Sequence, residues 1–239
     1  AVPSGYLALC TANLPEPTIG PNSTSQADDY FETVLWTGND TDDTAIAVNF
    51  KPDFTWIKQR TSTAYHNLSN STVGATKALF SNATDVEGTN SDRLKAFTST
   101  GFTLGDASDV NASSNTYVAW NWKANGGTAT ATISESGDNP AASVQANPTA
   151  GFSIVTYTGT GDTGTIAHGL GAVPTWILIK NREATDSWAV YHGANTAAPA
   201  TDYLILDTSA ATADSDTMWA DTAPTDSVFT VHDSHQVNA

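Results

Sequence analysis

An internal repeat constrains the fold of this chain more than any other feature of its sequence. The stretch GFTLGDASDVNASSNTYVAWNWKA begins at Gly101, and its first half recurs as VFTVHDSHQVNA between Val228 and Ala239. A Phe, a Thr, an Asp and a Val-Asn-Ala triplet recur at matching positions. Because self-similarity over a long period marks a repeated structural unit, we expect two copies of one fold.

Three further pairs of segments extend the repeat. FETVLWTGND from Phe31 resembles FSIVTYTGTG from Phe152, and ATKALFSNA resembles ATDYLILDT. A Pro-x-x-x-x-x-Lys-x-Arg motif matches without gaps as PDFTWIKQR at 52–60 and PTWILIKNR at 174–182. The offset between the copies grows from 121 to 127 residues along the chain. Insertions therefore fall in loops, where folded repeats tolerate them.

The composition favours strands over helices. Of 25 acidic residues, 20 are Asp and 5 are Glu, and Asp suits turns whereas Glu suits helix interiors. Thr, Ser, Asn, Gly and Val are abundant, as in strands and tight loops. Short apolar runs with turn signals about every 8–12 residues are typical of sandwiches. We predict an all-β protein with two tandem β-sandwich (jelly-roll-like) repeats.

The same signals set the boundaries of the units. Residues 1–29 hold four prolines and predict an extended Pro-rich N-terminal arm. Residues 30–124 form the first repeat and residues 151–239 the second. Residues 125–150 are expected to form a hairpin around SGDNP or a flexible linker. Asp85–Lys95 is expected to be a short helix or a loop.

The second copy stops before any counterpart of the Trp-rich strand TYVAWNWK. In that strand Val118, Trp120 and Trp122 share one face, and this pattern predicts that they face the core. A sandwich without this strand has an open edge and exposed apolar surface. We therefore expect that the chain is a segment of a longer polypeptide or that another chain supplies the strand.

The net charge of −16 argues against a nucleic-acid groove and against docking on an anionic membrane. The single cysteine, Cys10, cannot form an internal disulfide. The sequence shows no apolar run of about 18 residues and no basic-then-apolar secretion signal. The acidity itself is the ordinary means of keeping a surface soluble.

Clustered oxygen ligands in Asp-rich turns make a calcium site one candidate. The residues concerned are Asp106, Asp109 and Asn111. A calcium ion binds about six to eight oxygen ligands. No EF-hand spacing is present. Ordinary turn chemistry is the alternative, and we expect no other cofactor or metal.

Aromatic residues with polar neighbours are candidates for a sugar-stacking surface. They are Trp36, Trp188, Trp219 and Tyr203. Core packing is the alternative role for each of them.

Basic and histidine residues give weaker signals. Two basic pairs occur at matching positions, Lys58 with Arg60 and Lys180 with Arg182. We expect each pair either to bind an acidic sugar or phosphate or to form ion pairs with nearby Asp-rich loops. His66 and His192 both follow a tyrosine and are expected at equivalent strand positions. No nucleophile elbow is present, and we predict that the protein is not an enzyme.

Several phrases of the sequence resemble a known family of viral proteins. FKPDFTWIKQR, GATKALFSN, GFTLGDASDVNASSNTYVAWNWKA and NPTAGFSIVTYTGTG are similar to a repeat domain of tail-fibre-like virion proteins of marine bacteriophages. The opening PSGYLALCTANLPEPTI resembles a junction that follows a concanavalin-like (SPRY-type) domain in those proteins. The resemblance implies a virion-associated, β-rich and trimeric fibre or appendage, with no catalytic residues to transfer.

With the tandem all-β units, the resemblance implies a structural module of a phage virion that attaches to a host-surface glycan or protein. Repetition along a fibre multiplies weak contacts through effective concentration. The expected partners are other virion proteins and further copies of the chain. A purely architectural role in a capsid or fibre shaft, and a polysaccharide-degrading tail enzyme, are the alternatives.

Overall fold

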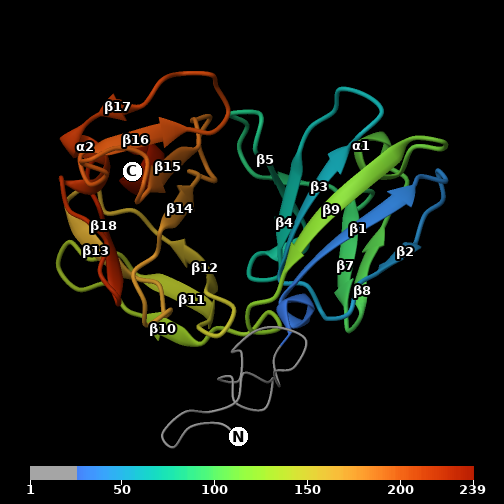
Figure 1. The fold of residues 1–239 in the computed structure, drawn as a ribbon, viewed down its shortest axis with the longest axis horizontal. Coiled ribbons are helices and arrows are strands. Elements are labelled where there is room, and N and C mark those ends of the chain that lie inside the picture. Colours follow the sequence, from blue (N-terminus) through green and yellow to red (C-terminus); the bar gives the residue numbers. More distant parts are fainter. Residues whose placement is uncertain (1–25) are drawn as a thin grey trace, which may run out of the picture.

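The computed structural model describes residues 26–239 and confirms the all-β prediction (Figure 1). The predicted N-terminal arm lies mostly outside these residues. In the first repeat the short helices are η2 (Ala27–Asp29) and α1 (Ser108–Asn111). Its strands are β1 (Phe31–Thr37), β2 (Thr44–Ala47), β3 (Phe54–Gln59), β4 (Asn67–Asn70), β5 (Gly74–Phe80), β6 (Gly88–Thr89), β7 (Leu94–Thr98), β8 (Gly101–Leu104) and β9 (Thr116–Trp122).

The first repeat is a sandwich of two antiparallel sheets. One sheet has the order β1-β9-β3-β4-β5-β6 and the other β2-β8-β7. Inward-facing side chains from both sheets form its core, because alternate residues of a strand point to one face. The buried members are Ile46, Ile57, Leu94, Phe102, Leu104, Val110, Tyr117 and Ala119.

The second repeat builds most of the same arrangement from strands of equal or shorter length. After a hairpin of β10 (Ala131–Ile133) and β11 (Ala142–Asn147) come β12 (Phe152–Tyr157), β13 (Gly164–Ala167), β14 (Trp176–Ile179), β15 (Ala189–His192), β16 (Asp202–Ile205), β17 (Ala213–Asp214) and β18 (Val228–Val231). Its helices are α2 (Asp216–Trp219) and α3 (His235–Asn238). The sheets are β10-β11-β12, β13-β18 and β14-β15-β16-β17.

Strand pairing follows the sequence repeat. The pairs β2–β8, β3–β4, β4–β5 and β5–β6 recur as β13–β18, β14–β15, β15–β16 and β16–β17. One difference is that α2 takes the place of β7. Its Met218 carbonyl accepts a hydrogen bond from His232, as the Arg93 carbonyl accepts one from Gly105. The two halves are therefore copies of one sandwich.

The Trp-rich strand β9 packs with the opposite face from the one predicted. Tyr117 and Ala119 enter the core and are fully buried, whereas Trp120 and Trp122 are only partly buried. Trp120 packs edge-on against Trp56, and the Trp122 ring lies 6.0 Å from that of Phe152. The large rings thus cover the outer face of the sheet and the contact with the second repeat, because the narrow core already holds Tyr117.

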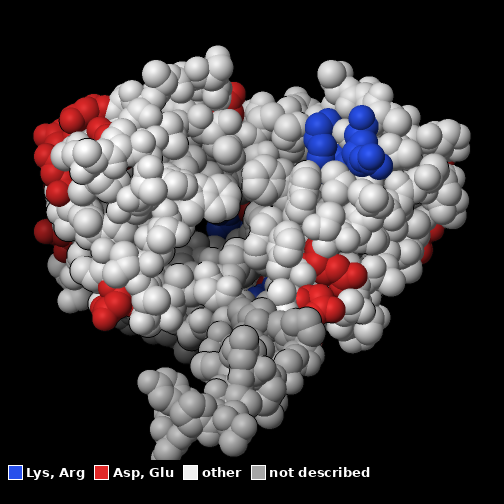
Figure 2. Space-filling view, in the orientation of Figure 1, with Lys and Arg blue, Asp and Glu red and all other residues white. Residues whose placement is uncertain are grey.

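The two repeats meet at a small number of named contacts. Trp188 Nε1 donates to the carbonyl oxygens of Phe80 at 2.8 Å and of Ala83 at 3.2 Å. Arg182 forms a two-point ion pair with Glu87, at 2.7 and 2.8 Å. Figure 2 shows a hollow between the two lobes, with groups of acidic side chains elsewhere on this face.

The stretch Asp85–Lys95 is mostly loop, one of its two predicted alternatives, but it contains the short strand β6 and the start of β7. Leu94 is part of β7 because it is a core residue that pairs with Leu104 despite its polar surroundings. The predicted equivalence of His66 and His192 is wrong. His66 precedes β4, whereas His192 ends β15. Since β4 and β15 are equivalent strands, these two histidines are not at equivalent positions.

Candidate functional site

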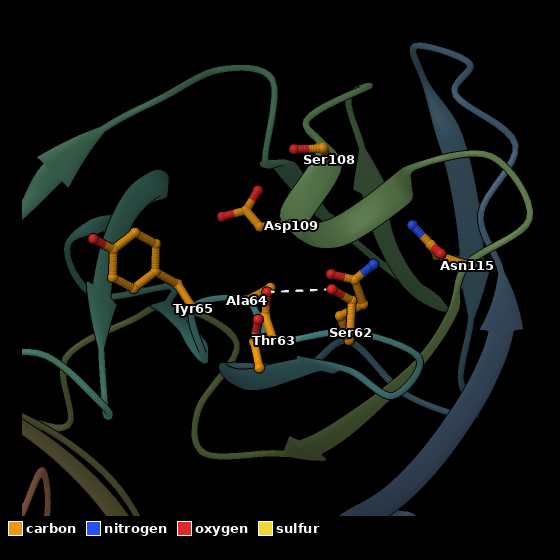
Figure 3. A pocket seen from close by; sticks show the side chains of 8 residues that line it. Ser62, Thr63, Ala64, Tyr65, Ser108, Asp109 and Asn115 are labelled. Atoms are coloured by element: carbon orange, nitrogen blue, oxygen red, sulfur yellow. Dashed lines mark hydrogen bonds between the residues drawn. The ribbon is translucent and has the colours of Figure 1, made fainter.

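A surface recess of about 410 Å³ lies between α1 and the loop that follows β3. Tyr65 and Asp109 flank it, and α1 contributes Ser108 (Figure 3). The remaining lining residues are Gln59, Ser62, Thr63, Ala64 and Asn115. The lining thus combines one aromatic ring with hydroxyl, amide and carboxylate groups.

A chain of four side chains fixes the geometry of this recess. The Tyr65 ring stacks on Phe80, with centroids 4.4 Å apart. Arg93 lies over the Phe80 ring at 5.0 Å and bonds Asp109 through Nε at 2.7 Å. Because each member is held by the next, Tyr65 and Asp109 keep fixed positions while Tyr65 remains 44% exposed.

The arrangement is suited to a neutral, hydroxyl-rich ligand. An exposed aromatic ring with polar groups around it offers an apolar face and directional hydrogen bonds. The charge of Asp109 is offset by Arg93, so the recess gives no strong preference for a charged group. A sugar ring has this combination of an apolar face and surrounding hydroxyls.

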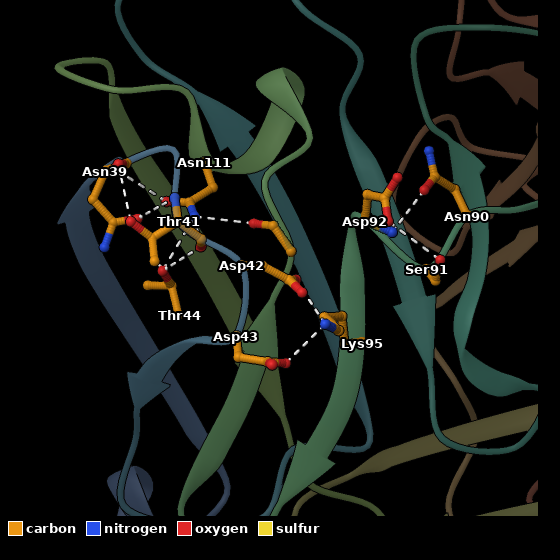
Figure 4. A network of polar contacts seen from close by, with 11 residues as sticks. Asn39, Thr41, Asp42, Asp43, Thr44, Asn90, Ser91, Asp92, Lys95 and Asn111 are labelled. Carbon is orange, nitrogen blue, oxygen red and sulfur yellow. Dashed lines mark hydrogen bonds and ion pairs between the residues drawn. The ribbon is translucent and has the colours of Figure 1, made fainter.

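The Asp-rich loop proposed for calcium is held by one buried amide. Asn111 is 0% exposed. Its Oδ1 accepts from the Asn39 amide at 3.2 Å, and its Nδ2 donates to the carbonyls of Thr41 and Gly105 at 3.0 and 2.9 Å (Figure 4). The second repeat repeats this network, because Asn238 contacts Thr160 and Asp162 in the same way.

The other two predicted calcium ligands, Asp106 and Asp109, have different surroundings. Asp109 pairs with Arg93, and Asp106 is exposed. Nearby, Lys95 bonds Asp42 at 2.6 Å and Asp43 at 2.8 Å, and the first of these bonds lowers the pKa of Asp42. The structure therefore does not bring Asp106, Asp109 and Asn111 together as a set of ligands. Residues 26–239 contain no group of three or more His, Cys, Asp and Glu side chains placed to hold a metal ion.

The predicted sugar-stacking aromatics lie inside the fold. Trp188 and Trp219 are 4% and 2% exposed, so neither offers a ring face to a ligand. Trp36 is only partly buried, but it stacks on Tyr117 and packs against the first core. Tyr203 is partly buried and packs against the second core. Core packing, the alternative considered for these residues, accounts for the positions of Trp36, Trp219 and Tyr203, whereas Trp188 is buried where it bonds the first repeat.

The two lysines of the basic pairs close turns. Lys58 Nζ donates to the carbonyls of Gln59 and Ser62, and Lys180 Nζ donates to those of Asn181 and Ala184. These contacts are equivalent in the two repeats. The predicted bonds between these lysines and Asp residues are therefore replaced by bonds to backbone carbonyls, whereas Arg182 does pair with an acidic residue, Glu87.

Comparison with protein families gives a match over most of the chain. Residues 26–239 fit the sequence profile of a domain of unknown function, DUF7483. The chain belongs to the DUF7483 family. The match covers both sandwiches. Searches of curated proteins and of solved structures returned no significant match to this DUF7483 chain.

Sequence reasoning missed Tyr65 as a site residue of this DUF7483 protein. The motif Ala-Tyr-His drew attention to its histidine, whereas the exposed ring belongs to the tyrosine. Its signal was an aromatic residue within the polar segment TSTAYHN. Among residues 26–239, no helix has the length and apolar character needed to cross a membrane.

Proposed function

We propose that this DUF7483 chain is a repeat module of a bacteriophage virion appendage, and that it attaches to a host-surface glycan through the Tyr65 recess. One observation carries the binding part of the proposal. Tyr65 is exposed yet held in place through Phe80, Arg93 and Asp109. Pre-organised side chains lose little entropy on binding.

The virion part of the proposal is supported by the resemblance of four long phrases to marine phage repeat proteins. Tandem all-β units also suit a fibre, because each unit is rigid and successive units add contacts. We expect the protein to assemble as a homotrimer with other virion proteins as neighbours, and sedimentation of the full chain measures its oligomeric state.

A purely architectural role is the second candidate. It is favoured by the use of Asn111, Asn238, Lys58 and Lys180 inside the fold, which leaves fewer loop side chains for a ligand. In that role the chain contacts neighbouring virion proteins and no host molecule. Hydrolysis of a host polysaccharide would instead support an enzyme.

Binding to an array of purified bacterial surface polysaccharides and to intact marine bacteria tests the proposal. We expect the full chain to bind at least one target, and Tyr65→Ala to weaken that binding about tenfold or more, which corresponds to about 1.4 kcal/mol. Leu35→Ala is the matched control, because Leu35 is 61% exposed and outside the recess. Equal binding by Tyr65→Ala, or no binding to any target, would contradict attachment through this recess.

A further inference from the structure

In the first repeat, β9 is the strand that joins β1 to β3. It pairs antiparallel with both, over seven residues of β1 and six of β3. In the second repeat, the equivalents of β1 and β3 are β12 and β14. Among residues 26–239, no strand pairs with both β12 and β14.

The hairpin strand β11 does not take the place of β9. In the first repeat, Gly38 donates to the Asn115 carbonyl, so its backbone groups point toward the β9 side. In the second repeat, Thr158 donates to the Ala141 carbonyl. Thr158 matches Thr37, the neighbour of Gly38, and successive residues of a strand direct their backbone groups to opposite edges. The hairpin therefore covers the other edge of β12, and the edge that β9 would use has no strand partner within the described residues 26–239.

Within the described part of the chain, the corresponding edge of β14 also has no strand partner. Gly193 donates to the Thr175 carbonyl just as Ser71 donates to the Asp53 carbonyl, so β15 lies on the same edge of β14 as β4 does on β3. The inward-facing Ile177 is partly exposed, whereas its equivalent Thr55 is 0% exposed. The edges of β12 and β14, and the partly exposed Ile177, thus face the position that β9 fills in the first repeat.

One segment of this chain has the sequence of the strand that fills it. Residues 5–13 read GYLALCTAN, and residues 116–125 read TYVAWNWKAN. The alignment places Tyr6 on Tyr117 and Ala8 on Ala119, and Ala-Asn follows in both after a one-residue gap. Tyr117 and Ala119 are the two β9 residues in the first core. Tyr6 and Ala8 therefore match the two β9 residues that pack in the core of the first repeat.

We propose that residues 5–11 add to the second repeat as the strand between β12 and β14, antiparallel to both. The donating segment belongs to the same chain. Its C-terminal end would lie beside Phe152, whose ring is 6.0 Å from Trp122, and the Trp122 ring is 5.0 Å from Phe31. The described chain begins at residue 26, five residues before Phe31. Fourteen residues separate position 11 from residue 26, and a chain of that length can span at most about 45 Å, which is ample for this connection.

The side chains of the segment fit the differences between the repeats. In the first repeat, Asn121 Oδ1 accepts from Thr55 Oγ1 at 3.0 Å. In the alignment, Cys10 matches Asn121, and Ile177 matches Thr55. A polar pair is thus replaced by a compatible apolar pair, because a free cysteine packs as a small hydrophobic residue.

The tyrosine hydroxyl has equivalent partners as well. Tyr117 accepts from the Ala112 amide at 2.8 Å and donates to the Ser108 carbonyl at 2.9 Å. The matching groups of the second repeat are the Ala239 amide and the His235 carbonyl. Tyr6 would bond both, and so tie the segment to α3.

Disulfide trapping in the full chain tests this placement. Asn121 lies directly opposite Thr55 in the β3–β9 register, so the variant Ile177→Cys places a thiol opposite Cys10, the only native cysteine. Oxidised glutathione accepts the two electrons as the disulfide forms. We expect a disulfide between positions 10 and 177 within one chain, detected by mass spectrometry after digestion under non-reducing conditions.

Two further variants make the outcome decisive. Ser153→Cys places the thiol on β12, opposite position 10 in the register of Glu32 with Asn121, and it keeps the test valid if Ile177→Cys does not fold. Leu178→Cys is the control, because its side chain leaves the opposite face of β14. Disulfide-linked dimers would overturn the same-chain placement in favour of a second copy. No faster disulfide formation in Ile177→Cys and Ser153→Cys than in Leu178→Cys would overturn the assignment of this segment altogether.

Discussion

Asn111 and Asn238 hold the same loop in the two repeats. Asn111 accepts from the Asn39 amide and donates to the Thr41 carbonyl, while Asn238 accepts from the Thr160 amide and donates to the Asp162 carbonyl. The residues are 0% and 1% exposed. A buried amide that satisfies several backbone groups links the first strand of each sandwich to the short helix near the end of its repeat.

Loss of either amide should destabilise the protein substantially. Asn111→Ala leaves the Asn39 amide and the Thr41 and Gly105 carbonyls without their partner, and we expect the free energy of unfolding to fall by about 2–3 kcal/mol. Asp106→Ala, in the same loop but exposed, should change it by less than about 0.5 kcal/mol. Urea unfolding measures both, and equal effects of the two variants would contradict this role.

Gly38 and Gly159 permit close approach of the chain to the same helix end. A Cβ at Gly38 would lie 2.2 Å from the Ala112 carbonyl oxygen, and one at Gly159 would lie 2.1 Å from that of Ala239. We expect Gly38→Ala to cost about 1–3 kcal/mol through forced backbone shifts. Gly88→Ala is the control, since a Cβ there meets nothing within 4 Å. Thermal unfolding distinguishes them, and a Gly38→Ala protein as stable as Gly88→Ala would refute the close approach.

The ion pair between Arg182 and Glu87 links the repeats. Its two bonds of 2.7 and 2.8 Å are of the bidentate kind, but the Arg182 side chain is 42% exposed. We therefore expect a coupling energy of only about 0.5–1 kcal/mol. A double-mutant cycle with Arg182→Ala and Glu87→Ala measures it. Strict additivity of the two substitutions would show that the pair does not hold the repeats together.

His66 should make stability sensitive to mild acid. Burial, and next the charge of Lys58, lower the pKa of His66 below its ordinary 6.5 in the folded state. As the pH falls below 6.5, His66 is protonated in the unfolded chain before it is protonated in the folded chain. The free energy of unfolding is therefore higher above pH 6.5 and decreases as the pH falls below it. We expect urea unfolding of His66→Gln to show a smaller loss between pH 7.5 and pH 5 than wild type. His192→Gln, at an exposed histidine, is the control, and a loss in His66→Gln equal to that of wild type would contradict the sign.

Most of the architecture could be predicted from the sequence because the internal repeat shows which segments form equivalent strands. Matching phrases such as PDFTWIKQR and PTWILIKNR identified β3 and β14 as equivalent strands. The predicted core face of β9 was wrong because alternation shows which residues share a face but not which face is inward. Here Tyr117 and Ala119 fill the core, and the tryptophans cover the outside.

The candidate site was harder to predict than the fold. Asn111 was singled out as an oxygen ligand, but its role depends on backbone groups of Asn39, Thr41 and Gly105, which no pattern places beside it. The recess depends on Tyr65, Phe80, Arg93 and Asp109 from four separate segments. Contacts of this kind follow from tertiary packing and leave no spacing signal in one sequence.

The second repeat has the fold of the first, and the proposed strand takes the position that β9 occupies in the first repeat. Amide hydrogen exchange of Ser153, Val155 and Tyr157 in the full chain tests this placement, because the backbone groups of these residues face that position. We predict protection comparable to that of their equivalents Glu32, Val34 and Trp36, which pair with β9. Exchange of the three amides at the rate of an unfolded chain would contradict this placement.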